Sequence, residues 1–95
     1  MAVYVDDMKA EFGRMIMCHM VADTHDELVE MADKLNLNRK WLQKPGTAGE
    51  HFDVSLGYRA KAVKLGAKEI TWTECGEMCW NRRGEAGKLA YYGHR

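Results

Sequence analysis

The sequence lacks the features that mark a membrane or secreted protein. Its longest nearly continuous apolar run, residues 15–22, is far shorter than the ~20 residues that a membrane-spanning helix needs. The first residues, MAVYVDDMK, contain neither a basic segment nor an apolar segment of the kind that directs export. The three cysteines are too few and too unevenly spaced for a disulfide framework. These absences predict a cytoplasmic protein with reduced thiols and no membrane partner.

A net charge of one sign is also absent, since 14 basic residues balance 14 acidic ones. This balance argues against a general nucleic-acid coat, so nucleic acid is not indicated as a partner. The charges are nevertheless divided: residues 1–50 carry six Lys/Arg against nine Asp/Glu, and residues 51–95 carry eight against five. The basic C-terminal end is typical of a solvated tail. The alternative is a patch for phosphate or for the acidic face of a second copy.

Hydrophobic residues make up 46% of the 95 residues, which is enough for one domain with a small core. Local propensity and alternation predict strands at residues 2–6, 15–22, 51–54 and 67–72. Residues 8–14 have the composition of a loop. The only proline, Pro45, lies in residues 38–50, which we expect to form the main loop.

Capping residues predict where the helices begin and end. Thr24 followed by Glu27 is a capping box, and an apolar stripe continues from it at helical spacing. Ser55 is expected to cap a helix over residues 56–65 that ends at Gly66. Thr73 is expected to cap a short C-terminal helix. The stripe consists of Leu28, Met31, Ala32 and Leu35, with Asn36 as the expected left-handed C-cap.

The order of these elements predicts an α/β fold. We expect a small single domain with about four strands in a mostly parallel sheet, two main helices and a short C-terminal helix. Residues 1–80 would form the domain, and residues 81–95 a C-terminal tail or interface segment.

Several His and Asp side chains are expected at one edge of this sheet. His19 is the lone polar residue in the apolar run 15–22, and Asp23 follows that run. His51 and Asp53 are two residues apart in a strand, so both side chains lie on one face. Imidazole and carboxylate groups can bind Zn²⁺, Mn²⁺ or Fe²⁺, or transfer protons. Taken singly, each residue also fits a structural role, such as a core histidine or a helix cap.

A second, weaker candidate lies on the predicted C-terminal helix. Cys75 and Cys79 are four residues apart, and His94 follows them. The spacing allows two metal ligands on one helix face, but a pair of small core residues is the more common outcome.

The short motifs together resemble the family of small bacterial and phage proteins called domain of unknown function 4031. The resemblance covers about residues 2–72. It rests on the segments Val3–Asp7, Cys18–Asp23, Asp26–Leu28 and His51–Ser55, on Arg59, and on the Gly66–Ala67 helix exit. It implies a bacterial or phage cytoplasmic protein and no particular activity. It also implies that the recurring polar positions are His19, Asp23, His51, Asp53 and Arg59.

Three functions fit these observations. The first is a protein that binds a small polar, phosphorylated or nucleotide-like ligand at an edge pocket, where Arg59 would contact an anionic group. The second is a metal-dependent phosphodiesterase or nuclease. The third is an interaction module without a small ligand. The ligand-binding set would be His19, Asp23, His51, Asp53 and Arg59, and the metal-binding set His19, His51, Asp53 and Asp6.

The aromatic residues of the second half suggest a homodimer. Trp72, Trp80, Tyr91 and Tyr92 would leave an apolar patch exposed on a monomer. The acidic first half and the basic second half can also pair across a two-fold axis. The C-terminal segment is therefore expected at the interface, unless it folds back onto its own sheet.

Overall fold

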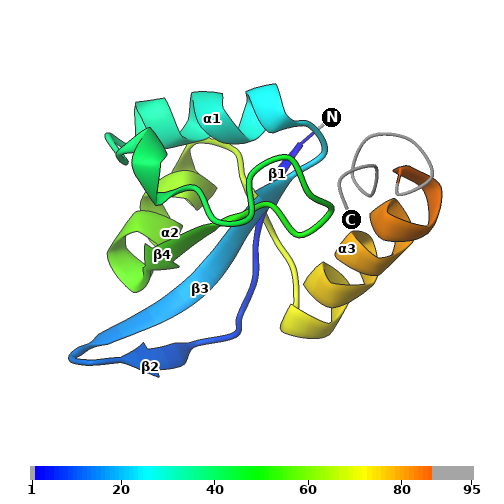
Figure 1. Cartoon of the computed structure of the whole chain (residues 1–95). Coiled ribbons are helices and arrows are strands. Elements are labelled where there is room, and N and C mark those ends of the chain that lie inside the picture. The colour runs from blue at the N-terminus through cyan, green and yellow to red at the C-terminus, as the bar shows by residue number, and fades with distance from the viewer. Residues whose placement is uncertain (1, 87–95) are drawn as a thin grey trace.

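The computed structural model describes residues 2–86, with side chains through Arg82, as an α/β fold built on a mixed sheet (Figure 1). The strands are β1 (Val3–Val5), β2 (Ala10–Phe12), β3 (Met15–Ala22), β4 (Phe52–Ser55) and β5 (Lys68–Glu69). The helices are α1 (His25–Lys34), the 3-10 turn η1 (Arg39–Trp41), α2 (Leu56–Lys64) and α3 (Trp72–Ala86). In this part of the chain, no helix is both long enough and apolar enough to cross a membrane.

The sheet is mixed, so the expectation of a mostly parallel sheet is wrong. The long strand β3 pairs antiparallel with β1, β2 and β4, and within residues 2–86 only β1 and β5 run parallel. The cause lies in residues 8–14, which were expected to be a loop. They contain β2, and Gly13, with φ of 64°, closes a tight turn that folds β2 back on β3 as a hairpin. The first two predicted strands therefore form antiparallel neighbours.

The helix ends confirm most of the predicted capping signals. The Thr24 hydroxyl accepts a hydrogen bond from the Glu27 amide at 3.2 Å. Asn36 adopts a left-handed conformation after α1, with φ of 59°. Ser55 caps α2, and Gly66, with φ of 106°, ends it. Local sequence signals therefore determine both main helices.

Helix α3 differs from its prediction in both position and length. Its cap is Thr71 rather than Thr73: the Thr71 hydroxyl accepts from the Glu74 amide at 3.0 Å, and the Glu74 carboxylate accepts from the Thr71 amide at 2.8 Å. The helix has 15 residues and continues past residue 80, the expected end of the domain. Residues 87–95, which include Tyr91, Tyr92 and His94, lie outside the described residues.

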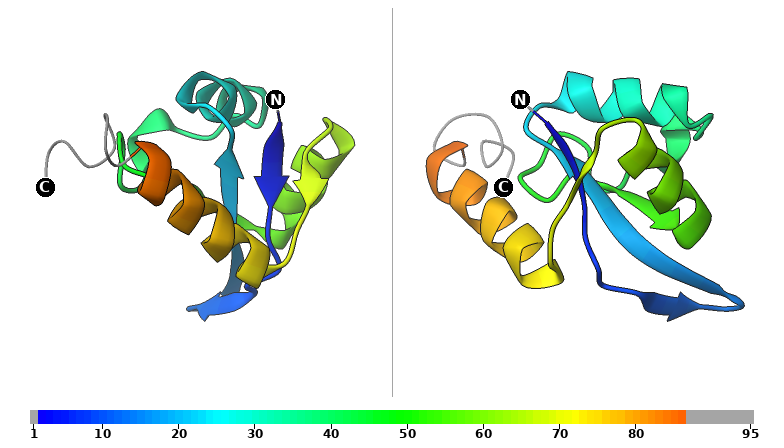
Figure 2. Two further views of the ribbon diagram at one scale, coloured as in Figure 1. Left: turned by 90° about the vertical axis from the view of Figure 1, so that its right-hand side faces the viewer. Right: turned by 180° about the vertical axis from the view of Figure 1, so that it is seen from behind.

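The two faces of the sheet have different partners, because side chains alternate along each strand. One face carries Cys18 and Met20 of β3 and Phe52 of β4, which pack with α1 and α2 in the hydrophobic core. The other face carries His19 and Asp53, and α3 lies on this side (Figure 2). Hydrogen bonds from Arg82 to the Ala22 carbonyl and from the Trp72 amide to Asp7 hold α3 there. The polar face of the sheet is therefore the one that can form a site.

Candidate metal centre

The pairing of β3 with β4 brings three of the predicted site residues together. His19 lies directly opposite Asp53 in the register, and His51 stands two residues before Asp53 on the same face. The His51 Nε2 atom is 3.4 Å from Asp53 Oδ1, and the His19 Nε2 atom is 3.9 Å from the same oxygen. The two imidazole rings meet edge to face, with centroids 4.8 Å apart. Two ring nitrogens therefore converge on one carboxylate oxygen.

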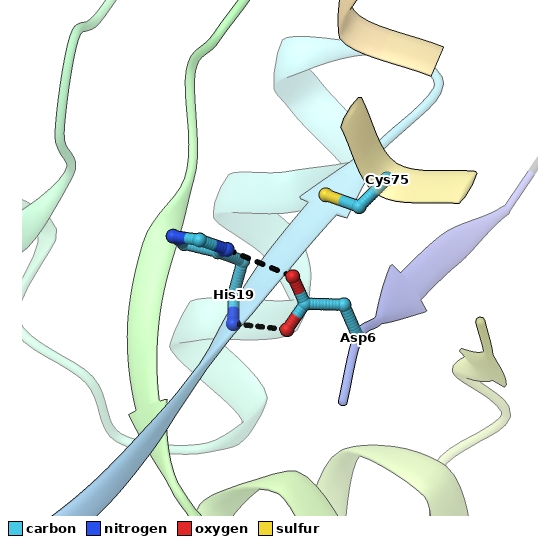
Figure 3. Close-up of side chains that lie close together, drawn as sticks. All are labelled: Asp6, His19 and Cys75. Atoms are coloured by element: carbon cyan, nitrogen blue, oxygen red, sulfur yellow. Dashed lines mark hydrogen bonds and ion pairs between the residues drawn. The ribbon is translucent and has the colours of Figure 1, made fainter. Parts of the chain in front are cut away.

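Asp6 contacts the Nδ1 atom of the His19 ring, on the side away from Asp53 (Figure 3). Its Oδ2 atom is 2.8 Å from His19 Nδ1, and its Oδ1 atom accepts from the His19 amide at 2.7 Å and from the Met8 amide at 3.2 Å. The Asp6 side chain is fully buried. A carboxylate in this position accepts a hydrogen bond from Nδ1–H and leaves Nε2 as the nitrogen that can bind an ion.

The irregular chain between β1 and β2 explains why Asp6 can reach His19. Both strands pair with β3, and the residues between them bulge, with Lys9 at φ of 50°. In the bulge, the Asp6 carboxylate replaces a backbone carbonyl as the acceptor for the His19 amide. Asp6 was predicted as a metal ligand. In this structure both of its oxygens accept hydrogen bonds from His19, and a carboxylate oxygen also lies within 4.8 Å of ligand atoms of His19 and Cys75, a second group of possible metal ligands.

The His51 ring is oriented in a similar way. Its Nδ1 atom donates to the Gly49 carbonyl at 2.7 Å, which directs Nε2 toward Asp53. Metal-bound histidines in proteins usually donate their second N–H to a carboxylate or carbonyl, as both histidines do here. One ligand atom each from His19, His51 and Asp53 lies within 4.8 Å of the others. Two imidazoles and a carboxylate form a ligand set suited to Zn²⁺, Mn²⁺ or Fe²⁺.

The contact between Asp6 and His19 shifts the pKa of both groups. Burial raises the pKa of the Asp6 carboxyl, but hydrogen bonds from the His19 ring and from the His19 and Met8 amides outweigh burial and bring it below its usual value. The hydrogen bond to Asp6 raises the pKa of His19 above its ordinary value, against the lowering effect of burial. The negative charges of Asp6 and Asp53 raise it further. The pair therefore favours a carboxylate beside a protonatable imidazole.

The other two predicted site residues form contacts elsewhere. Asp23 accepts hydrogen bonds from the Ala2 amide at 2.7 Å and from the Tyr4 hydroxyl at 3.3 Å, at the start of β1. Arg59 donates from Nε to the Asp6 backbone carbonyl and from Nη1 to Glu69, each at 2.8 Å. Arg59 thus supports the bulge that carries Asp6, and these hydrogen bonds go to Asp6 and Glu69 rather than to the two histidines.

Helix α3 adds a thiol, that of Cys75, that the sequence did not place with the histidines. Cys75 is buried, and its sulfur lies within 4.8 Å of ligand atoms of Asp6 and His19 (Figure 3). A hydrogen bond with Cys79, together with burial, raises the pKa of Cys75, and the same hydrogen bond lowers the pKa of Cys79. The positive charges of Arg82, His19 and Lys44 lower the pKa of Cys79 further. No local pattern in the sequence indicates that this helix lies against β3.

Comparison with known proteins gives one match. The family model described as protein of unknown function (DUF4031) matches residues 3–82 of the chain. The match includes the candidate metal ligands and continues into α3, beyond the span of about residues 2–72 over which the sequence shows its resemblance. No curated protein and no solved structure matches the chain.

Proposed function

The chain belongs to the DUF4031 family, whose description gives no activity, and we propose from the site that the protein is a metal-dependent phosphodiesterase. His19, His51 and Asp53 would bind one divalent ion. The observation that supports this proposal most directly is the convergence of two Nε2 atoms on Asp53, with each Nδ1 atom already bonded to a protein acceptor. Metal-bound histidines usually donate their second N–H to a carboxylate or carbonyl, and the bonds of His19 to Asp6 and of His51 to Gly49 fit that pattern.

The ligand set also suits catalysis. Three protein ligands leave an open position on an ion such as Zn²⁺, as in catalytic rather than structural zinc sites. A bound ion would polarise a phosphoryl oxygen and lower the pKa of a coordinated water. The Asp6 carboxylate, bonded to Nδ1, would hold the His19 ring in place and keep the proton on Nδ1, so that Nε2 can bind the ion. Asp53 is partly exposed, so the ligand face is open to substrate.

Cationic groups near the site favour an anionic substrate. The positive charges of Lys44, Arg82 and His19 all lower the pKa of the Cys79 thiol. A phosphorylated or nucleotide-like molecule bound at the ion would enter the same positive field. Arg59, which was expected to contact such a group, donates instead to Asp6 and Glu69. Arg82 likewise donates to the Ala22 carbonyl, so Lys44, an exposed side chain, is the cation that we propose would contact the charge of a substrate.

A second candidate function is metal-dependent binding of a phosphorylated ligand without turnover. Many phosphate-ester hydrolases use two ions about 3.5–4 Å apart as a clamp. In the part of the chain that the structure describes, both groups of candidate ligands include His19, so they do not form two independent sites. A site for one ion is therefore also compatible with binding of a phosphorylated ligand alone.

Hydrolysis of bis(p-nitrophenyl) phosphate by the metal-free protein, with Zn²⁺ or Mn²⁺ then added, tests the proposal. We expect metal-dependent release of nitrophenol that is lost in His51→Ala and Asp53→Asn. Glu11→Gln, an exposed acid on β2, is the matched control and should retain the activity. Metal binding without hydrolysis would favour the binding function. If the folded protein shows no metal-dependent activity and no metal binding, both candidates fail.

Assembly and location are further parts of the proposal. We place the protein in the cytoplasm of a bacterium, or of a host cell if a phage encodes it, as the resemblance implies. We also propose a homodimer through α3, because Trp72 and Trp80 are 60% and 67% exposed. Light scattering should give twice the mass of the chain, and Trp72→Ser should weaken the association. A monomer of the full-length protein at micromolar concentration would contradict the dimer.

A further inference from the structure

Two buried charged side chains occur among residues 2–82, and each adjoins a candidate metal-binding histidine, one through a hydrogen bond and one in the sequence. Asp6 is 0% exposed and Glu50 is 2% exposed. Burial of a carboxylate is costly unless its oxygens are bonded, so a small domain retains few of them. Asp6 supports His19 directly. Glu50 immediately precedes His51, which raises the question of whether it has an equivalent role.

The Glu50 carboxylate accepts hydrogen bonds that hold together the loop before β4, residues 43–51. Its Oε1 atom accepts from the Gly46 amide at 3.1 Å and lies 2.7 Å from His25 Nδ1, at the first turn of α1. The loop also bonds to itself, since the Glu50 amide donates to the Thr47 carbonyl at 3.1 Å. The carboxylate therefore connects three parts of the chain: the loop, its own strand entry and α1.

The same loop holds the group that orients the His51 ring. Gly49 supplies the carbonyl that accepts from His51 Nδ1, and Glu50 lies between these two residues in the chain. At the neck of the loop, the Gln43 amide donates to the His51 carbonyl at 2.8 Å, and the His51 amide donates to the Gln43 carbonyl at 3.1 Å. Backbone bonds thus fix His51 on one side, while the position of the Gly49 carbonyl depends on the loop that Glu50 closes.

We propose that Glu50, held by His25, is a positioning residue that fixes the Gly49 carbonyl and thereby directs His51 Nε2 to the metal. This inference rests on the proposed metal centre. Glu50 does not contact the ion in this arrangement. Without its carboxylate, the Gly46 amide and the His25 ring lose their shared acceptor, and the loop no longer holds the His51 ring in one orientation. In the intact protein, the buried carboxylates of Asp6 and Glu50 would each support one metal-binding histidine.

Titration of the metal-free protein with Co²⁺ tests this role, because the visible spectrum of Co²⁺ reports the geometry of its ligands. Glu50→Ala should weaken Co²⁺ binding by about 10–100-fold, the usual effect of removing a group behind a metal ligand, and change the spectrum of the bound ion. Glu50→Gln retains an oxygen that can accept from Gly46 and His25, so it should restore the wild-type spectrum and most of the affinity. Glu30→Ala, on the exposed face of α1, is the control and should match the wild type.

The outcomes separate this inference from the metal centre itself. If the wild-type protein binds no Co²⁺, the proposed metal centre fails and the positioning role fails with it. If folded Glu50→Ala binds Co²⁺ with wild-type affinity and spectrum, the positioning role alone is refuted. Should Glu50→Ala not fold, His25→Ala replaces it, because the His25 side chain is 54% exposed and its loss leaves the core intact. Weaker Co²⁺ binding with an altered spectrum supports the role, and unchanged binding refutes it.

Discussion

Replacing Asp6 with asparagine separates the hydrogen bonds of this side chain from its charge. In Asp6→Asn, the side-chain oxygen can still accept from the His19 and Met8 amides, as Oδ1 does now. The amide NH₂ group takes the place of Oδ2, which is 2.8 Å from His19 Nδ1. Because NH₂ donates, Nδ1 must become the acceptor, and the ring proton moves to Nε2. The nitrogen that faces Asp53 is then no longer available to a metal ion.

The structure sets the size of the expected effects. Asp6→Asn loses one charge-assisted hydrogen bond, which costs about 1.5–3 kcal/mol of folding free energy. Asp6→Ala loses all three bonds and leaves buried donors without acceptors, which costs about 3–5 kcal/mol. A domain of this length is typically stable by about 5–14 kcal/mol, so the asparagine variant should remain folded. Its Zn²⁺ affinity should nevertheless fall by about 10–100-fold.

Calorimetric titration with Zn²⁺ and urea unfolding followed by tryptophan fluorescence measure the two effects separately. Glu11→Gln makes the same acid-to-amide change on the exposed strand β2 and should alter neither quantity. If folded Asp6→Asn binds Zn²⁺ as tightly as the wild type, the hydrogen bond from His19 does not select the ring nitrogen, and the reasoning about the site is wrong.

Three further predictions concern stability. In metal-free protein, the stabilisation from the lowered pKa of Asp6 is lost as the pH falls through the folded-state value, below the ordinary 3.8. The stabilisation from the raised pKa of His19 is complete below the ordinary 6.5 and is lost as the pH rises through the folded-state value. The difference in unfolding free energy between wild type and Asp6→Asn should therefore be largest between the ordinary pKa values, 3.8 and 6.5. A difference that does not vary with pH would contradict the interaction between Asp6 and His19. Phe52→Ala, at a fully buried core position, should cost about 3–5 kcal/mol in urea unfolding, and a cost below about 1 kcal/mol would contradict its place in the core. Arg59→Ala removes the donor to the Asp6 carbonyl and to Glu69 and should cost about 1–3 kcal/mol by thermal or urea unfolding, whereas an unchanged midpoint would show that neither bond stabilises the fold.

Local signals in the sequence predicted the main helices and the centre of the candidate site. Capping residues such as Thr24 and Gly66 act within a few residues of the chain, so their effect can be read without the fold. The lone histidine in an apolar run and the alternation of His51 with Asp53 likewise indicated the polar face of the sheet. The structure brings His19, His51 and Asp53 together, but through an antiparallel register rather than at the edge of a parallel sheet.

The remaining features depend on contacts between distant parts of the chain. The sheet is mixed because β2 and β3 form a hairpin, and Gly13 is the one signal of the hairpin turn in the sequence. The contacts of Asp6 and Glu50 depend on a bulge and a closed loop, which no periodicity predicts. Asp23 was grouped with the histidines because it follows β3, yet it bonds to the start of β1. The position of a residue along a strand predicts the face of the sheet on which its side chain lies, whereas its hydrogen-bond partners depend on the tertiary fold.

X-ray absorption at the zinc edge, on protein loaded with one equivalent of Zn²⁺, tests the central claim most directly. The account predicts a first shell of nitrogen and oxygen atoms at about 2.0–2.2 Å with the scattering pattern of two imidazoles. The signal of one imidazole should disappear in His51→Ala. A sulfur shell at about 2.3 Å would place the ion on Cys75 or Cys79 of α3 instead and would contradict the assignment of His19, His51 and Asp53 as the metal ligands.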